Sequence, residues 1–143
     1  MEPRISIITL GVADLDKAYE FYANGLGFPT NRNPELDIVF FQMQGTCLAL
    51  YPHAKLAEDV GERFEGGERA KFSGITLAYN ARTKEEVDEV VKQAVAAGGK
   101  LEKPPQDASW GGYSGYFSDP DGHLWEVAWG AFEFNDDGSL EIP

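Results

Sequence analysis

An internal repeat constrains the fold of this chain more than any other feature of its sequence. Ile8-Thr9-Leu10-Gly11 is followed 67 residues later by Ile75-Thr76-Leu77-Ala78. Each copy is an apolar, β-prone segment that leads through a short polar turn into an amphipathic helix of about 10 to 15 residues. We therefore expect two copies of one supersecondary unit.

Both predicted helices carry their own start signals. Asp14 is the expected N-cap of the first helix, which Gly25 or Gly27 would end. Thr83 and Glu86 form a capping box for the second helix, which a Gly-Gly pair would end. Apolar residues recur at helical spacing in both segments: Leu15, Ala18, Tyr19 and Tyr22 in the first, and Val87, Val90, Val91, Ala94 and Val95 in the second.

Strands are expected after each helix, at residues 38–43, 46–51, 112–118 and 123–129. Asp119-Pro120-Asp121-Gly122 places proline and glycine where a tight turn needs them, so it predicts a hairpin between the last two strands. Gln44-Gly45 is the matching turn of the first half. Each half is then a strand, a helix and two or three further strands.

One domain is expected, in four parts. The segment between the halves is rich in charge and glycine, with one short helix predicted at 54–58, and is expected to be a linker or lid. The tail contains a turn sequence and is expected to wrap the surface. The parts are module 1 at about 4–52, the linker at 53–71, module 2 at about 72–130 and the tail at 131–143.

Composition excludes several classes of partner. The 143 residues are 43% hydrophobic, enough for about one globular domain. Twelve Lys and Arg against 24 Asp and Glu give a formal charge of −12. A field of that sign repels nucleic-acid backbones and anionic membrane surfaces, so we expect neither partner.

The single cysteine, Cys47, excludes an intrachain disulfide and a zinc site built from several thiolates. We expect it to be a small buried apolar residue. No apolar run reaches the roughly 18 residues of a membrane span, and the first residues lack the apolar stretch of a signal peptide. A cytoplasmic protein is expected.

Two motifs together resemble the vicinal oxygen chelate superfamily, which includes glyoxalase I, extradiol dioxygenases, fosfomycin resistance enzymes and bleomycin-binding proteins. The first combines residues 11–16 (Gly-Val-Ala-Asp-Leu-Asp) with Phe21-Tyr22 and 26–28 (Leu-Gly-Phe), and the second is 119–127 (Asp-Pro-Asp-Gly-His-Leu-Trp-Glu-Val). The resemblance implies an α+β fold in which two βαβββ modules form curled mixed sheets around a central cup. It also implies a homodimer and a small-molecule ligand in the cup.

Metal-dependent members of that family place His, Gln or Glu at four strand positions facing the cup. By motif spacing these positions fall on Ile7, Ala49, Gly74 and Glu126, of which only Glu126 has a side chain that can bind a metal. One carboxylate does not hold a divalent ion, because zinc takes about four ligands and hard cations about six. We therefore expect no metal and no other cofactor. His53 and His123 are expected to be ordinary loop or turn residues.

Alternation along the strands predicts what else lines the cup. Leu124 and Ala128 share the face of Glu126, and Ile5 and Thr9 share that of Ile7. Cys47, Tyr51, Thr76 and Ala78 are assigned to the cup in the same way. A glutamate among apolar neighbours is partly desolvated, which suits it to proton transfer near neutrality. The alternative is a carboxylate paired for structural reasons alone.

Residues 110–116 alternate large aromatic side chains with glycines ahead of a strand. Trp110 and Tyr113 are the best candidates for a ligand-binding rim, since aromatic rings can stack on a planar ligand. The alternative is a bulged strand whose aromatic residues pack in the core or at a dimer interface. Trp125 and Trp129 have the opposite parity to Glu126 and are expected to pack against the helices.

The resemblance leaves several functions open. The first is a metal-independent glyoxalase-like enzyme, a lyase or isomerase acting on a small carbonyl or hydroxy compound, in which Glu126 is the catalytic residue. The second is a non-catalytic binding protein that is similar to the bleomycin-resistance members. Two further alternatives are a metal-dependent lyase or dioxygenase, if the ligand mapping shifts, and a structural or regulatory subunit. The interpretation adopted is a metal-independent protein that binds or transforms a small organic molecule.

Overall fold

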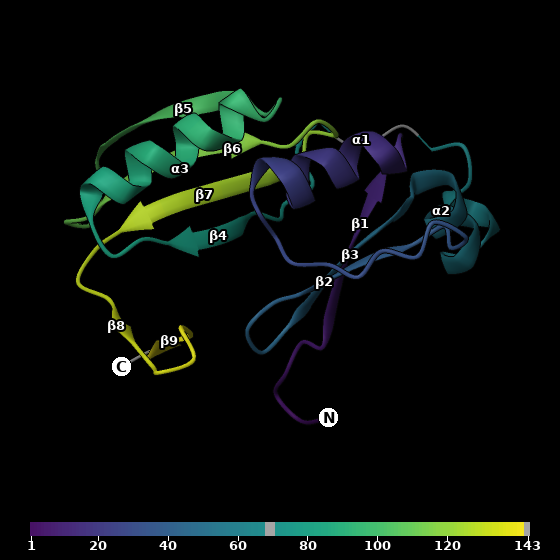
Figure 1. The fold of residues 1–143 in the computed structure, drawn as a ribbon, viewed down its shortest axis with the longest axis horizontal. Helices are drawn as coiled ribbons and strands as arrows, with labels where there is room; N and C mark the ends of the chain where they lie inside the picture. Colours follow the sequence, from purple (N-terminus) through teal and green to yellow (C-terminus); the bar gives the residue numbers. More distant parts are fainter. Residues whose placement is uncertain (68–70, 142–143) are drawn as a thin grey trace.

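The computed structural model describes residues 1–67 and 71–141, which form two modules that share one core (Figure 1). The first module contains β1 (Ile7–Val12), α1 (Leu15–Tyr19), the π-helical segment η1 (Glu20–Gly25), β2 (Val39–Gln42) and β3 (Cys47–Pro52). The second contains β4 (Leu77–Asn80), α3 (Lys84–Ala96), β5 (Lys100–Asp107), β6 (Tyr113–Ser118) and β7 (Leu124–Trp129). Between and after them lie α2 (His53–Val60), the 3-10 turn η2 (Glu62–Phe64), β8 (Glu133–Phe134) and β9 (Leu140–Glu141).

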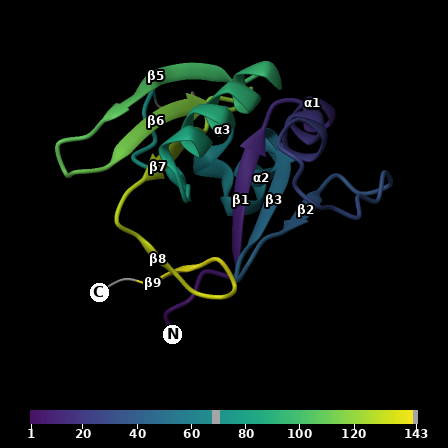
Figure 2. The same cartoon turned by 60° about the vertical axis from the view of Figure 1, so that its left-hand side comes forward.

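Both modules use the same strand order. In the first sheet the order is β1-β3-β2, with β1 parallel to β3 and β2 antiparallel to it. In the second sheet the order is β4-β7-β6-β5, with β4 parallel to β7 and the other pairs antiparallel. The internal repeat and the predicted α+β fold with curled, mixed sheets are confirmed. In both views α1 and α3 lie together on one side of the molecule (Figures 1 and 2).

The modules differ in one element. The second has three strands after its helix, whereas the described residues of the first have only two. A loop over residues 29–38 occupies the place of the missing strand, and Thr30 Oγ1 donates a hydrogen bond to the Phe40 carbonyl of the edge strand β2 (2.7 Å). Pro29 and Pro34 explain the loop, because proline cannot donate to a strand ladder.

Local signals place the helices where the sequence predicts them. Asp14 accepts a hydrogen bond from the Lys17 amide (2.9 Å), and Thr83 accepts one from the Glu86 amide (3.1 Å). Each cap satisfies a backbone donor that has no partner within its helix. The short helix predicted in the linker is also present, as α2. In the described residues no helix is long and apolar enough to cross a membrane.

A buried polar cluster joins the two modules. Tyr22 of η1 donates a hydrogen bond to Asp119 (2.7 Å), and the indole of Trp125 donates one to the Tyr22 hydroxyl (3.1 Å). Asp119 also accepts hydrogen bonds from the amides of Asp121 and His123. Burial, followed by the charge of Asp119, raises the pKa of Tyr22 well above its ordinary value. The phenol therefore remains protonated and can act as the donor to Asp119.

The predicted turn at 119–122 also holds the end of β1. Asp121 Oδ1 accepts a hydrogen bond from the Ala13 amide (2.7 Å), and His123 Nε2 donates one to the Gly11 carbonyl (2.8 Å). Gly122 has a φ of 85°, as the turn requires. His123 is thus a turn residue, as predicted, and the closing motif of the sequence connects the modules.

The tail returns to the first module. After β7 the chain passes to the opposite side of the molecule from α1 and α3, where β8 and β9 form a small hairpin (Figure 2). Gly138, in the turn of this hairpin, lies directly against the side chain of Gln44. The tail therefore links the end of the second module to the β2–β3 turn of the first.

Candidate functional site

Each sheet has one face towards the helices and one face away from them, which we call the cup face. In the first sheet the alternation places Leu10, Val12, Leu48 and Leu50 in the core. The register pairs Ile7 with Cys47, Thr9 with Ala49, and Gly11 with Tyr51 on the cup face. The strand alternation predicted for these residues is therefore present.

The cup face of the first sheet is apolar and open. Ala49 is fully buried, with Phe40 opposite it in β2, whereas Ile7 is 51% exposed and Phe40 is 45% exposed. A cavity of about 460 Å³ lies over the β2 edge of this face, between Phe40, Cys47 and the loop at 29–38. Cys47 is half-buried and lines this cavity.

The cup face of the second sheet is polar. Glu126 lies on it between Leu124 and Ala128, and Ala78 of β4 is its register partner. Tyr116 of β6 is the partner of Glu126 on the other side. Both Glu126 and Tyr116 are half-buried. Burial raises the pKa of Tyr116, and a hydrogen bond to Glu126 raises it further.

A second carboxylate is close to this face. Ser118 Oγ, which is buried, donates a hydrogen bond of 2.7 Å to Glu102 Oε1 in β5. This hydrogen bond lowers the pKa of Glu102. Sequence reasoning missed Tyr116, Ser118 and Glu102. Counting outward from the 119–122 hairpin would have found the first, because that turn pairs Ser118 with Leu124 and hence Tyr116 with Glu126.

The repeat is two residues longer in space than in sequence. Thr9 is the partner of Ala49, and Ala78 is the partner of Glu126, so Thr9 and Ala78 are equivalent and lie 69 residues apart. The position that corresponds to Ile7 is therefore Thr76, and the assignment of Gly74 is wrong. Gly74 lies before β4 begins, with a φ of 77°.

The residues at the four family positions do not fit a metal ion. With Thr76 in place of Gly74, the set is Ile7, Ala49, Thr76 and Glu126, and only the last offers a carboxylate. Over residues 1–67 and 71–141 there is no group of three or more His, Cys, Asp or Glu side chains that could hold a metal. The donor set therefore provides one oxygen-bearing anion where about four to six ligands are needed.

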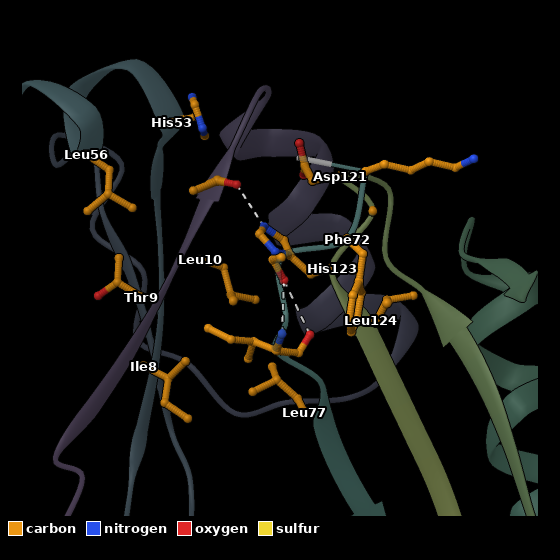
Figure 3. Close-up of a pocket in the computed structure, with 15 residues that line it drawn as sticks. Ile8, Thr9, Leu10, His53, Leu56, Phe72, Leu77, Asp121, His123 and Leu124 are labelled. Atoms are coloured by element: carbon orange, nitrogen blue, oxygen red, sulfur yellow. Dashed lines mark hydrogen bonds between the residues drawn. The ribbon is translucent and has the colours of Figure 1, made fainter. Parts of the chain in front are cut away.

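A cavity of about 560 Å³ opens at the seam between β1 and β4 (Figure 3). Two predicted site residues, Thr9 and Leu124, line it from opposite modules. His53 and Leu56 of α2 border it on one side and Phe72 on another, and a dashed line joins His123 to β1. The seam cavity therefore joins the modules where the sequence predicted the cup.

The remaining predicted ligand residues are not all brought together. Tyr51 is half-buried at the end of β3, and Thr76 is exposed just before β4. Trp110 is 54% exposed and packs against Phe132, with their ring centroids 6.1 Å apart. Its indole ring also lies against Gly112, where a side chain would collide with it.

Tyr113 does not line the cup, which corrects its assignment. Its register partner is Trp129, and its hydroxyl donates a hydrogen bond of 2.9 Å to Asp88 of α3. This bond raises the pKa of Tyr113. The two glycines beside Tyr113 gave no alternation from which to read its face. Trp125 is buried in the core and Trp129 packs against it, as predicted.

Comparison with known proteins decides the family. Residues 4–127 match the model of the Glyoxalase/Bleomycin resistance protein/Dioxygenase superfamily. The chain belongs to this superfamily. A glyoxalase-related enzyme from Fulvimarina pelagi has a solved structure that superposes with a TM-score of 0.85 at 37% identity, over 98% of each chain.

Two further relatives define the neighbourhood of this superfamily member. The protein YraH of Bacillus subtilis, described as uncharacterized, is 31% identical over 122 residues, which are 84% of this chain and 93% of YraH. A lactoylglutathione lyase from Agrobacterium tumefaciens is 25% identical, with a TM-score of 0.65 over 90% of this chain and 94% of the lyase. The resemblance identified from the sequence motifs is therefore confirmed.

Proposed function

We propose that this superfamily member binds a small organic molecule in the cup without a metal ion and that Glu126 contacts the polar group of that molecule. The observation that carries the proposal is the contrast between the two cup faces. One face offers apolar surface around Ala49, and the other offers a carboxylate beside a phenol. Small-molecule sites combine a mainly apolar lining with a few polar groups in the same way.

We assign Glu126 the role of acid or base in a lyase or isomerase reaction on a small carbonyl or hydroxy compound. Its half-buried position supports this role, since partial desolvation favours proton exchange near neutral pH. The reaction class is supported by the likeness to the lactoylglutathione lyase. Glu126 is therefore the proposed catalytic residue.

A second function, binding without catalysis, is favoured by one observation. The cup-face residues Ile7, Thr9, Ala49 and Phe40 include no acid or base, so only one half of the cup offers proton-transfer groups. A protein that only captures its ligand needs no more than this. The acidic surface, with a net charge of −12, suits a cationic ligand in that case.

We also propose a homodimer. Ile7 and Phe40 leave about half of their surface exposed on the first cup face, and Ile5 beside them is 65% exposed. Contiguous exposed apolar surface of this kind is typical of protein interfaces. A second copy would cover it and close the cup.

An NMR fragment screen of the ¹⁵N-labelled protein tests the ligand site. The library should contain small alcohols and amines together with their methyl ethers and N-methylated forms. We expect binding fragments to shift the amide signals of Ala49, Ala78 and Glu126. We also expect Glu126→Gln to weaken binding about tenfold or more, because hydrogen bonds to a charged group contribute about 1.5–3 kcal/mol. Fragments that bind elsewhere, or that ignore the substitution, would overturn the proposal.

Exchange in D₂O separates the two functions. An enzyme that moves a proton at carbon should introduce deuterium into a bound hydroxy or carbonyl compound, and Glu126→Gln should abolish this exchange. A binding protein should leave the compound unlabelled in both forms. NMR or mass spectrometry of the recovered compound gives the answer.

A further inference from the structure

Three side chains form a row across the cup face of the second sheet. Glu126 of β7 is paired with Tyr116 of β6, and Tyr116 is paired with Lys103 of β5. Neighbouring strands lie about 4.8 Å apart, so the three groups stand next to one another. The ammonium group of Lys103 lies 6.0 Å from the ring centroid of Tyr116, within the range of a cation–π contact.

The chemistry of the row assigns a donor and an acceptor. An ionised carboxylate only accepts hydrogen bonds, and its two oxygens provide about four acceptor sites. The phenol of Tyr116 has one O–H group, and the raised pKa of Tyr116 keeps that proton in place through neutral pH. Tyr116 therefore donates to Glu126 and occupies one of its acceptor sites.

No other side chain among the described residues shares Glu126. Across residues 1–67 and 71–141, Tyr116 is the one hydrogen-bond partner that Glu126 has. The neighbours of Glu126 along its strand on this face, Leu124 and Ala128, are apolar. Without the phenol, the Glu126 side chain would be free to change rotamer, because nothing else restrains its carboxylate.

We infer that Tyr116 is a positioning residue of the cup: its hydroxyl holds Glu126 in one orientation and leaves the other acceptor sites of that carboxylate for a ligand that carries a hydroxyl or N–H group. The inference rests on the proposed function, which places the ligand at Glu126. It adds a ligand class, since a molecule with acceptors alone has no donor to offer the carboxylate.

The first test measures the orientation of Glu126 directly and needs no ligand. Three-bond couplings across χ1 of Glu126 report whether the side chain occupies one rotamer. We expect one rotamer in the wild-type protein and averaged couplings in Tyr116→Phe, which removes only the hydroxyl. Tyr79→Phe is the matched control, because the hydroxyl of Tyr79 donates to another glutamate, Glu86, outside the cup. Unchanged couplings in Tyr116→Phe would overturn the inference.

A tyrosine titration tests the same bond from the other side. With ¹³Cζ-labelled tyrosine, Glu126→Gln should bring the ionisation of Tyr116 closer to the ordinary value of about 10, because it removes a negative acceptor. Glu86→Gln should change Tyr79 and leave Tyr116 alone. An unchanged Tyr116 in Glu126→Gln would overturn the inference without any bearing on ligand binding.

Fragment binding tests the ligand class and separates this inference from the proposed function. Alcohols and amines that bind at Glu126 should bind about fivefold more weakly to Tyr116→Phe, the loss expected for one hydrogen bond, whereas their methylated forms should not. Fragments that respond to Glu126→Gln but not to Tyr116→Phe would overturn the positioning role and leave the proposed function standing. If no fragment binds the cup, the proposed function fails and the ligand class fails with it, while the coupling and titration results still decide the role of Tyr116.

Discussion

The two modules share one strand order, yet their cup faces differ in chemistry. The first presents Ile7, Ala49 and Phe40, and the second presents Glu126 and Tyr116. Side chains alternate between the faces of a strand, so the helix face can keep its packing while the other face changes. The comparison teaches that the core preserves the repeat and that the cup faces carry the functional difference.

The junction between the modules belongs to neither cup face. It consists of the buried cluster around Asp119 and of the contact between η1 and α3, where Gly25 meets Ala97. Both lie on the helix side. Changes there should affect the stability of both modules together, whereas changes on a cup face should leave stability almost unaltered. The predictions below test this division, beginning with the largest effect.

Asp119→Ala should lower the free energy of unfolding by about 3 kcal/mol or more. The substitution leaves the hydroxyl of Tyr22 and two backbone amides without their buried acceptor, and each such donor costs about 1–3 kcal/mol. Urea unfolding followed by circular dichroism measures the change. Asp136→Ala, in the exposed turn of the tail, is the control and should stay within about 0.5 kcal/mol. A loss below 1 kcal/mol for Asp119→Ala would contradict the role of the cluster.

Gly25→Ala should cost about 1–3 kcal/mol, because the new methyl group would collide with Ala97 after α3. Its effect should reach both modules, which hydrogen exchange of amides in β3 and β7 can detect. Gly67→Ala is the matched control, since its Cβ would meet the Phe64 carbonyl at an ordinary 3.5 Å. Faster exchange confined to β3 would show that the modules unfold separately.

Alkaline pH should destabilise the protein through Tyr22. The pKa of Tyr22 is raised in the folded state, so above about pH 10 the unfolded chain releases this proton first and the folded state binds more protons. Stability is therefore retained below pH 10 and falls above it, by about 1.4 kcal/mol per pH unit for one group. Urea titrations between pH 9 and 11 should give a smaller slope for Tyr22→Phe than for the wild type. Equal slopes would mean that Tyr22 ionises alike in both states.

Ile7→Glu should change stability least, by about 0.5 kcal/mol or less, because Ile7 is half exposed. The proposed homodimer should nevertheless dissociate, since the substitution places a charge in its apolar interface. Native mass spectrometry gives the fraction of dimer. Leu101→Glu, at a similarly exposed apolar position in the edge strand β5, should leave the dimer intact. A dimer that survives Ile7→Glu would place the interface elsewhere.

Sequence patterns predicted the features that depend on neighbouring residues. The caps at Asp14 and Thr83, the hairpin turn at 119–122 and the alternation of β1, β3 and β7 each arise within a few residues of chain. Glu126 was identified in the same way. These features need only local hydrogen bonding and the two-residue period of a strand.

Three features were not predicted because they depend on how strands pair. The two-residue shift that replaces Gly74 by Thr76 is set by the register of β4 on β7. The helix-side position of Tyr113 and the contact of Tyr116 with Glu126 are set by the register of β6 on β7. A one-residue change in register exchanges the two faces of a strand, and glycines in the segment hide the pattern that would reveal it.

The sequence by itself therefore determined the repeated architecture, the family and one functional carboxylate, because each is encoded in short motifs and local periodicity. Tertiary structure alone decided which side chains meet that carboxylate and which side of the sheet they occupy. The physical reason is that strand pairing joins residues distant in the chain, and its register depends on how the whole core packs.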